Sequence, residues 1–140
     1  MSEEFQLRLV SPSAKLAEFA AKSVTLPGSE GYMTILPDHA PMVAELSAGS
    51  LTALDSHDKG DEYFISGGFV EVTHESVTVL ADIAEHGSAI DLDRAKAAKK
   101  RAEERLEGKS EIVDVERANA SLKRADLRIM IASTLAAASK

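Results

Sequence analysis

The amino-acid composition changes abruptly near Ser88 of the 140-residue chain, and this break limits the folds that the chain can adopt. All six aromatic residues, all four prolines and seven of the eight glycines lie in residues 1–88. Residues 89–140 contain 12 alanines, one glycine and no proline. The first composition is typical of strands and turns, and the second of helices. We therefore expect an α+β protein whose strands and helices form two separate domains.

Apolar and polar residues alternate in the first part, as they do in half-buried strands. Phe5, Leu7 and Leu9 are every second residue, so in a strand they would point to the same face. The same alternation recurs in residues 69–72 and 77–80. Turn residues interrupt these segments about every 8–12 residues, which is typical of antiparallel sandwiches and barrels. The sequence predicts an antiparallel β-sandwich over residues 1–87.

Two amphipathic segments follow, and they predict an antiparallel α-helical hairpin over residues 89–140. In residues 91–107 alanines and leucines recur every three or four positions, and Gly108 then ends the helix. Residues 114–139 contain a second, heptad-like series. Its members are Val115, Ala118, Leu122, Ala125, Ile129, Ala132 and Ala136.

Alanines make up most of this series, which bears on how firmly the helices pack. A buried methyl group contributes about 0.8 kcal/mol, whereas a buried leucine or isoleucine contributes about 1.5–3 kcal/mol. The hairpin is therefore expected to be modestly stable. Two interpretations stay open: a hairpin that docks, undocks or extends, and one that stays permanently packed.

Charge and composition exclude several classes of protein. The net charge is -7, with a net -10 in residues 1–88 and +3 in residues 89–140, so nucleic acid is not expected as the partner. The chain has no cysteine, which excludes disulfides and thiolate metal sites. It also has no long apolar run and no signal-peptide pattern at its start. These features predict a soluble protein of the cytoplasmic type.

No catalytic motif is recognisable in the sequence. It contains no phosphate-binding glycine loop, no HExxH and no GxSxG. The four histidines stand apart, each in or near an expected turn, so we predict neither a metal site nor a catalytic residue. Gly67 and Gly68 are predicted to form a turn or bulge before a strand, since no helix follows them.

Five segments resemble, in order and spacing, the epsilon subunit family of F-type ATP synthase. They are Leu26–Gly31 (LPGSEG), Ile35–Pro41 (ILPDHAP), Ser66–Val72 (SGGFVEV), Val77–Asp82 (VTVLAD) and Ile90–Ala95 (IDLDRA). The resemblance covers essentially the whole chain, including the order of sandwich and hairpin. Thr34 and Asp38 stand where the family commonly has glycine.

The resemblance implies a non-catalytic rotor subunit on the cytoplasmic face of the bacterial inner membrane, attached only through its complex. Its sandwich is expected to bind the gamma subunit and the ring of c subunits, and so to couple proton-driven rotation to ATP synthesis. The family also implies that the hairpin can extend to the alpha and beta subunits and inhibit ATP hydrolysis. The residues expected on the partner-binding side are Gly31, Tyr32, His39, Ala40 and Pro41.

Some relatives bind ATP on the folded hairpin, so the resemblance implies ATP as a regulatory ligand, with no cofactor required. The matching positions are Glu85, Ile90, Asp91, Arg94, Ala95, Arg124 and Arg128. Arg124 and Arg128 are four residues apart and share a helix face, so both can reach one phosphate group. The alternative stays open that Asp91 only caps the helix and that the arginines pair with Glu103, Glu104 or Asp126.

Two other functions remain as alternatives. A free-standing ATP-sensing module would use the hairpin as its binding site and the sandwich as a base. A small hydrolase or lyase would use the loop of His39, and it would need a pocket with a base beside a nucleophile.

Overall fold

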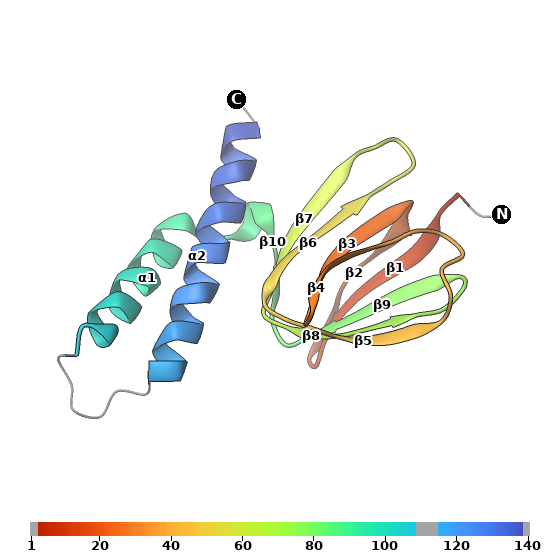
Figure 1. Ribbon diagram of the computed structural model, residues 1–140. Coiled ribbons are helices and arrows are strands. Elements are labelled where there is room, and N and C mark those ends of the chain that lie inside the picture. The colour runs from red at the N-terminus through yellow and green to blue at the C-terminus, as the bar shows by residue number, and fades with distance from the viewer. Residues whose placement is uncertain (1–2, 109–114, 139–140) are drawn as a thin grey trace. The chain divides into compact units, whose positions relative to one another are not determined.

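The computed structural model describes residues 3–108 and 115–138, and it divides into two compact units, Met1–His86 and Gly87–Lys140 (Figure 1). The first unit consists of strands, and the second contains a short 3-10 helix, η1 (Gly87–Ala89), and two α-helices. The predicted fold class, a β-sandwich followed by a helical hairpin, is confirmed. Neither of the described helices has a stretch apolar and long enough to span a bilayer.

The sheet unit contains ten strands connected by short turns. They are β1 (Phe5–Ser11), β2 (Ala14–Ala21), β3 (Ser23–Gly28), β4 (Gly31–Ile35), β5 (Met42–Leu46), β6 (Gly49–Leu54), β7 (Gly60–Ile65), β8 (Gly68–Val72), β9 (Ser76–Ala81) and β10 (Ala84–His86). The pairing order is β10-β7-β6-β3-β5-β8-β9-β1-β2, and β4 pairs with β3. All pairs are antiparallel except β1 with β9, which is parallel.

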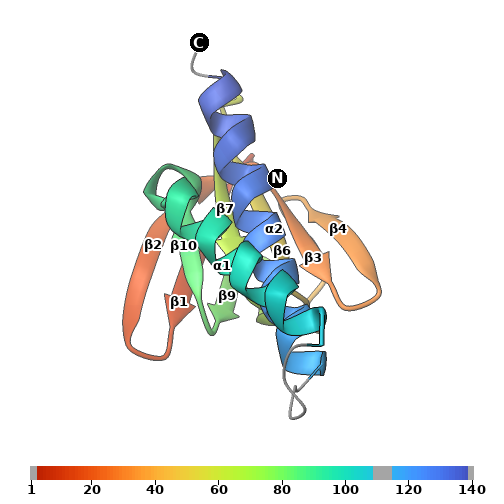
Figure 2. The same cartoon turned by 90° about the vertical axis from the view of Figure 1, so that its left-hand side faces the viewer.

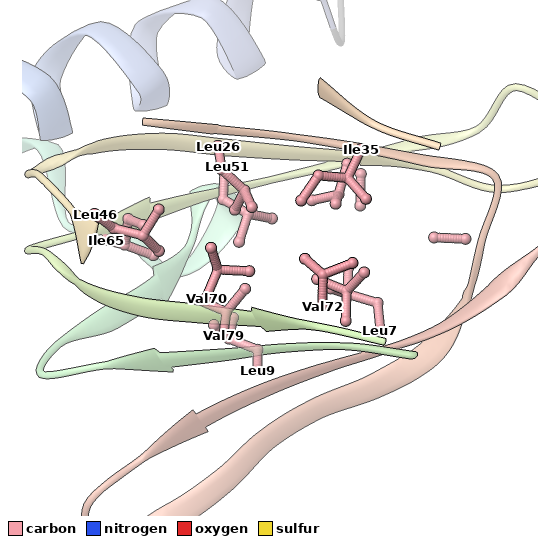
Figure 3. Packing of buried hydrophobic residues seen from close by; sticks show 14 of the residues in the cluster. Leu7, Leu9, Leu26, Ile35, Leu46, Leu51, Ile65, Val70, Val72 and Val79 are labelled. Carbon is pink, nitrogen blue, oxygen red and sulfur yellow. The ribbon is translucent and has the colours of Figure 1, made fainter. Parts of the chain in front are cut away.

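This continuous sheet folds into two layers. One layer contains β10, β7, β6, β3 and β4, and the other contains β5, β8, β9, β1 and β2. The layers are linked where β3 pairs with β5 at Gly28 and Leu46. Figure 3 shows Leu26, Leu51 and Ile35 extending from one layer toward side chains of the other.

The space between the layers is filled by apolar side chains, as the alternation predicts. Phe5, Leu7 and Leu9 are buried, and the polar residues between them face outward. Each buried aliphatic or aromatic side chain contributes about 1.5–3 kcal/mol. The buried cluster consists of Phe5, Leu7, Leu9, Ala21, Val24, Leu26, Ile35, Leu46, Leu51, Ala53, Ile65, Val70, Val72, Val77, Val79 and Ala81.

The second unit is an antiparallel helix pair, seen side by side in Figures 1 and 2. Helix α1 (Leu92–Leu106) begins after Asp91, whose carboxylate accepts the backbone N–H of Arg94. It ends before Gly108, where φ is +79°, as predicted. Helix α2 spans Val115–Ala138.

Most of the fully buried side chains of α1 and α2 are alanines. The buried alanines are Ala95 and Ala102 on α1 and Ala118 and Ala125 on α2. Two features of the predicted series were wrong: Val115 is 54% exposed, and Ile131, outside the series, is buried. A straight helix drifts by about 20° per heptad, so a strict seven-residue series does not stay on one face. The side chain of Ala136 lies outside the described residues.

Gly67 directly precedes β8 and Gly68 is its first residue, and both have a positive φ, +119° and +145°. The backbone of Gly68 also runs close to β9. A Cβ atom on Gly68 would lie 1.9 Å from the carbonyl oxygen of Leu80. Two independent constraints, the positive φ and the close approach, therefore require glycine at this position.

Alanine substitutions at Gly68 and at Gly31 distinguish the effect of a positive φ from the effect of the close approach to β9. Gly31 also has a positive φ, but nothing lies within 4 Å of its would-be Cβ. We expect Gly31→Ala to lower the free energy of unfolding by about 1–3 kcal/mol. Gly68→Ala should lower it by about 1–3 kcal/mol more, because the backbone must also shift. Urea unfolding of both variants measures the difference, and equal losses would show that the close approach does not matter.

Candidate functional site

Tyr32 is an exposed aromatic residue at the start of β4, directly after Gly31 in the β3–β4 turn. Its side chain is 57% exposed. The ring is nevertheless held at its end, because the Tyr32 hydroxyl accepts the backbone N–H of Ser50 at 3.1 Å. Gly31 and Tyr32 thus form one group of predicted partner-binding residues, fixed against β6.

The connection between β4 and β5 contains the other group, His39, Ala40 and Pro41. The ring of His39 is 2.6 Å from the carbonyl oxygen of Ala40, so Nδ1 must carry the hydrogen of this bond. Asp38 has φ +63°, the left-handed conformation that glycine adopts most easily. Glycine would therefore adopt the backbone conformation at position 38 without strain.

Strand β4 separates the two groups. With a rise of about 3.3 Å per residue, Tyr32 lies roughly 13 Å along the strand from Leu36, where the second group's connection begins. The structure therefore does not bring the five predicted residues into one continuous site. It places them at opposite ends of one edge strand.

An exposed apolar row lies on the outer face of the other layer, and the sequence analysis missed it. Leu80 on β9 pairs in register with Phe69 on β8 and with Val10 on β1. Phe69 is 53% and Leu80 46% exposed. Together with Pro12 and Asp82 these residues line a hollow of about 200 Å³. We call Val10, Phe69 and Leu80 the apolar row.

The signal for this row was present in the alternation itself. Val70 and Val72 face the core, so Phe69 must face outward, and Val77 and Val79 place Leu80 outward in the same way. The alternation of inward and outward residues does not reveal which strands are neighbours in the sheet. The three residues meet only because β9 lies between β8 and β1.

The two flanks of the helix pair carry different side chains. On one flank Lys99 of α1 and Asp126 of α2 form an ion pair at 2.9 Å. The hydrogen bond to Asp126, and its negative charge, raise the pKa of Lys99. Lys99 thus occupies one oxygen of Asp126, a carboxylate that the sequence also offered as a partner for an arginine.

Helix geometry puts arginines on the other flank. At about 100° per residue, measured from the buried alanines, Arg94, Arg124 and Arg128 lie on the side opposite the ion pair. The register that Lys99 and Asp126 set places Arg94 within about 5 Å, along the helix axes, of Arg128. The backbone positions of Arg94 on α1 and Arg128 on α2 therefore lie within about one helical turn of each other along the axes.

The remaining predicted nucleotide positions differ in their environment. The carboxylate of Asp91 accepts the N–H of Arg94 at 3.0 Å, so it is the N-cap of α1. Arg124 donates to the hydroxyl of Ser121 at 3.1 Å. Ile90 and Ala95 are buried. Glu85 lies in β10 and belongs to the sheet unit.

Histidines do not form a metal site in the part of the chain that the structure describes, where no three metal-ligating side chains gather. His86 is the last residue of β10 and directly precedes η1. Its Nε2 is 2.9 Å from the carboxylate of Asp61, and its ring meets Tyr63 edge to face. Burial, and then the charge of Asp61, raise the pKa of Tyr63.

Comparison with known families matches both units. Residues 4–87 match the family "ATP synthase, Delta/Epsilon chain, beta-sandwich domain". Residues 88–133 match the family "ATP synthase, Delta/Epsilon chain, long alpha-helix domain". The two matches together cover most of the chain.

Bacterial proteins named ATP synthase epsilon chain are similar over most of their length. The protein of Desulfitobacterium hafniense (strain DSM 10664 / DCB-2) is 46% identical over 106 residues, covering 76% of this chain and 80% of the relative. That of Syntrophomonas wolfei is 47% identical over 107 residues, covering 76% and 78%.

Solved structures have the same fold. A chain of the Euglena gracilis mitochondrial ATP synthase (OSCP/F1/c-ring) aligns with a TM-score of 0.71 at 24% identity, covering 100% of this chain and 84% of the other. A chain of the Tetrahymena thermophila mitochondrial ATP synthase (central stalk/c-ring) aligns with a TM-score of 0.56 at 14% identity, covering 94% and 95%.

Proposed function

The chain belongs to the delta/epsilon chain family of ATP synthase, and we propose that it is a rotor subunit joining the gamma subunit to the c-ring. It is an epsilon chain, an accessory subunit rather than a catalytic one. In this role it transmits torque and makes or breaks no covalent bond. We place it on the cytoplasmic face of the bacterial inner membrane, attached through its partners.

The observation that carries this proposal is the apolar row on the sandwich. Phe69 and Leu80 are large apolar side chains on neighbouring strands, both about half exposed, beside a hollow. Covering such a side chain contributes about 1.5–3 kcal/mol, and contiguous exposed apolar residues mark docking surfaces. We assign this face to the gamma subunit.

A subunit that joins two partners needs two separate surfaces. The apolar row lies on the outer face of the layer that contains β8, β9 and β1. Gly31 and Tyr32 lie on β4, at the edge of the other layer. We assign the β3–β4 turn to the c-ring, because the two layers then serve different partners and the core between them links both contacts.

Replacing Leu80 by glutamate tests the gamma contact. Leu80→Glu puts a carboxylate into the centre of the apolar row, so we expect at least a roughly tenfold loss of affinity for the gamma subunit. The matched control is Leu16→Glu on the edge strand β2, where Leu16 is 43% exposed against 46% for Leu80. Titration calorimetry measures both. Equal losses, or none at Leu80, would contradict the assignment.

We assign a regulatory role to the helix pair. Its contact consists mainly of alanines, and the ion pair of Lys99 with Asp126 is largely exposed. Small methyl groups and an exposed ion pair contribute little to the free energy of packing. A helix pair held in this way can separate at low cost, extend to the alpha and beta subunits, and block ATP hydrolysis.

Removing the helices from the assembled complex tests this role. We expect a complex with the chain truncated after residue 87 to assemble normally and to hydrolyse ATP faster than the complex with the full chain, since the blocking element is gone. Steady-state hydrolysis rates give the comparison, and co-purification of the subunits is the control. Equal rates would rule out inhibition. Loss of assembly would refute the division of roles.

ATP is our proposed ligand of the helix pair, and the grouping of arginines on one flank favours it. ATP phosphates accept hydrogen bonds from guanidinium groups, and Arg94, Arg124 and Arg128 supply these groups. Asp91 contributes indirectly, because its capping bond fixes the first turn of α1 next to Arg94. A free-standing ATP sensor would use the same residues but would bind tightly without any partner.

Calorimetry of the whole chain with ATP checks this ligand. We expect Arg94→Ala and Arg128→Ala each to weaken binding by about 10–100-fold, the loss of one charge-assisted hydrogen bond. Lys96→Ala is the control, because Lys96 is an exposed cation on the opposite flank of α1. Absence of heat at millimolar ATP, or an equal effect of Lys96→Ala, would remove the proposal.

A further inference from the structure

The ring of Tyr32 is unusual among the exposed apolar side chains because a backbone group holds its far end. The ring is 57% exposed, yet its hydroxyl accepts the N–H of Ser50 at 3.1 Å and lies 3.4 Å from the Ser50 hydroxyl. An exposed tyrosine ordinarily loses conformational entropy when a partner orders it. Here that ordering is present before any partner binds.

The bond replaces one that the sheet itself cannot make. Strands β3 and β6 pair over three residues each, from Ser23 opposite Leu54 to Thr25 opposite Thr52. The pairing ends there. Two residues further along β3 stands Pro27, whose carbonyl oxygen accepts the N–H of Ser47 at 2.8 Å. Tyr32 pairs directly with Pro27 across the β3–β4 turn, so its hydroxyl reaches the N–H of Ser50 where the pairing ends.

Gly49 provides the room for this arrangement. A Cβ atom at Gly49 would lie 2.7 Å from the Tyr32 hydroxyl oxygen and 2.7 Å from Cβ of Pro27. Both distances are shorter than real Cβ contacts, so any larger residue would displace the ring or the proline. Gly49 is therefore required by the position of Tyr32 as well as by the side chain of Pro27.

We propose that Gly49 and the N–H of Ser50 are positioning groups that hold Tyr32 as a fixed aromatic anchor for the c-ring. This inference rests on the proposed function, which places the β3–β4 turn against the ring. Tyrosine suits this contact because its aromatic ring can cover apolar groups of a partner while its hydroxyl stays hydrogen-bonded. Rigid aromatic anchors of this kind commonly dominate binding energies.

Hydrogen exchange in the free chain tests the positioning directly. Tyr32→Phe keeps the aromatic ring and removes only the acceptor, so we expect the amide of Ser50 to exchange about three- to tenfold faster. The amide of Thr52, two residues along the same strand, is the internal control and should not change. NMR resolves both amides. Unchanged exchange at Ser50 would overturn the positioning.

Affinity for the purified gamma–c-ring complex in detergent tests the anchor. We expect Tyr32→Phe and Gly49→Ala each to weaken binding by about three- to tenfold, and Tyr32→Ala to weaken it further. Leu36→Ala is the matched control, because Leu36 is also 57% exposed but has no such support. If Gly49→Ala does not fold, as judged by circular dichroism, Tyr32→Phe decides alone.

Different results would contradict the proposed function and the anchor role of Tyr32. If the unaltered chain does not bind the gamma–c-ring complex, the proposed function is wrong, and with it the partner of Tyr32. If the unaltered chain binds and Tyr32→Phe binds equally well, the function stands and the anchor is overturned. Equal losses for Leu36→Ala and Tyr32→Phe would also overturn it.

Discussion

The apolar core between the two layers of strands is the interaction on which the rest of the structure depends. Side chains such as Leu7, Leu26 and Val70 interlock there, and no charged or polar residue is buried among the described residues. Because a closely packed core resists deformation, the two outer surfaces keep their separation. A subunit that transmits torque between two partners needs this rigidity, and we propose that the apolar row and Tyr32 are its two separate contact sites.

The helix pair is built on the opposite principle. Its buried residues are mostly alanines, and Lys99 and Asp126 form an ion pair on one flank, so separating the helices costs little free energy. A firmly packed sandwich and weakly packed helices suit the proposed roles, in which the sandwich stays assembled while the helices change conformation. We propose that an anion bound by the arginines on the other flank shifts the equilibrium between packed and separated helices. It does so when it binds the packed helices more tightly than the separated ones.

Local patterns in the sequence predicted much of this structure, and long-range pairing explains the rest. The parity of Phe5, Leu7 and Leu9, the turn at Gly67 and the end of α1 at Gly108 all follow from neighbouring residues. The parallel pairing of β1 with β9 does not, since it joins segments about seventy residues apart. For the same reason the apolar row, and the bond from Ser50 to Tyr32, could not be found. On α2 the exposed Val115 shows that a heptad series overstates how much of a long helix one neighbour covers.

Hydrogen exchange across the whole chain, free and inside the assembled ATP synthase, tests the central claim most directly. The account predicts added protection in two separate places, around Leu80 on β9 and around the β3–β4 turn, with the β6–β7 turn near Asp58 unchanged. Protection of one surface alone, or of the β6–β7 turn in place of these two, would contradict a rigid sandwich that joins two partners through different layers.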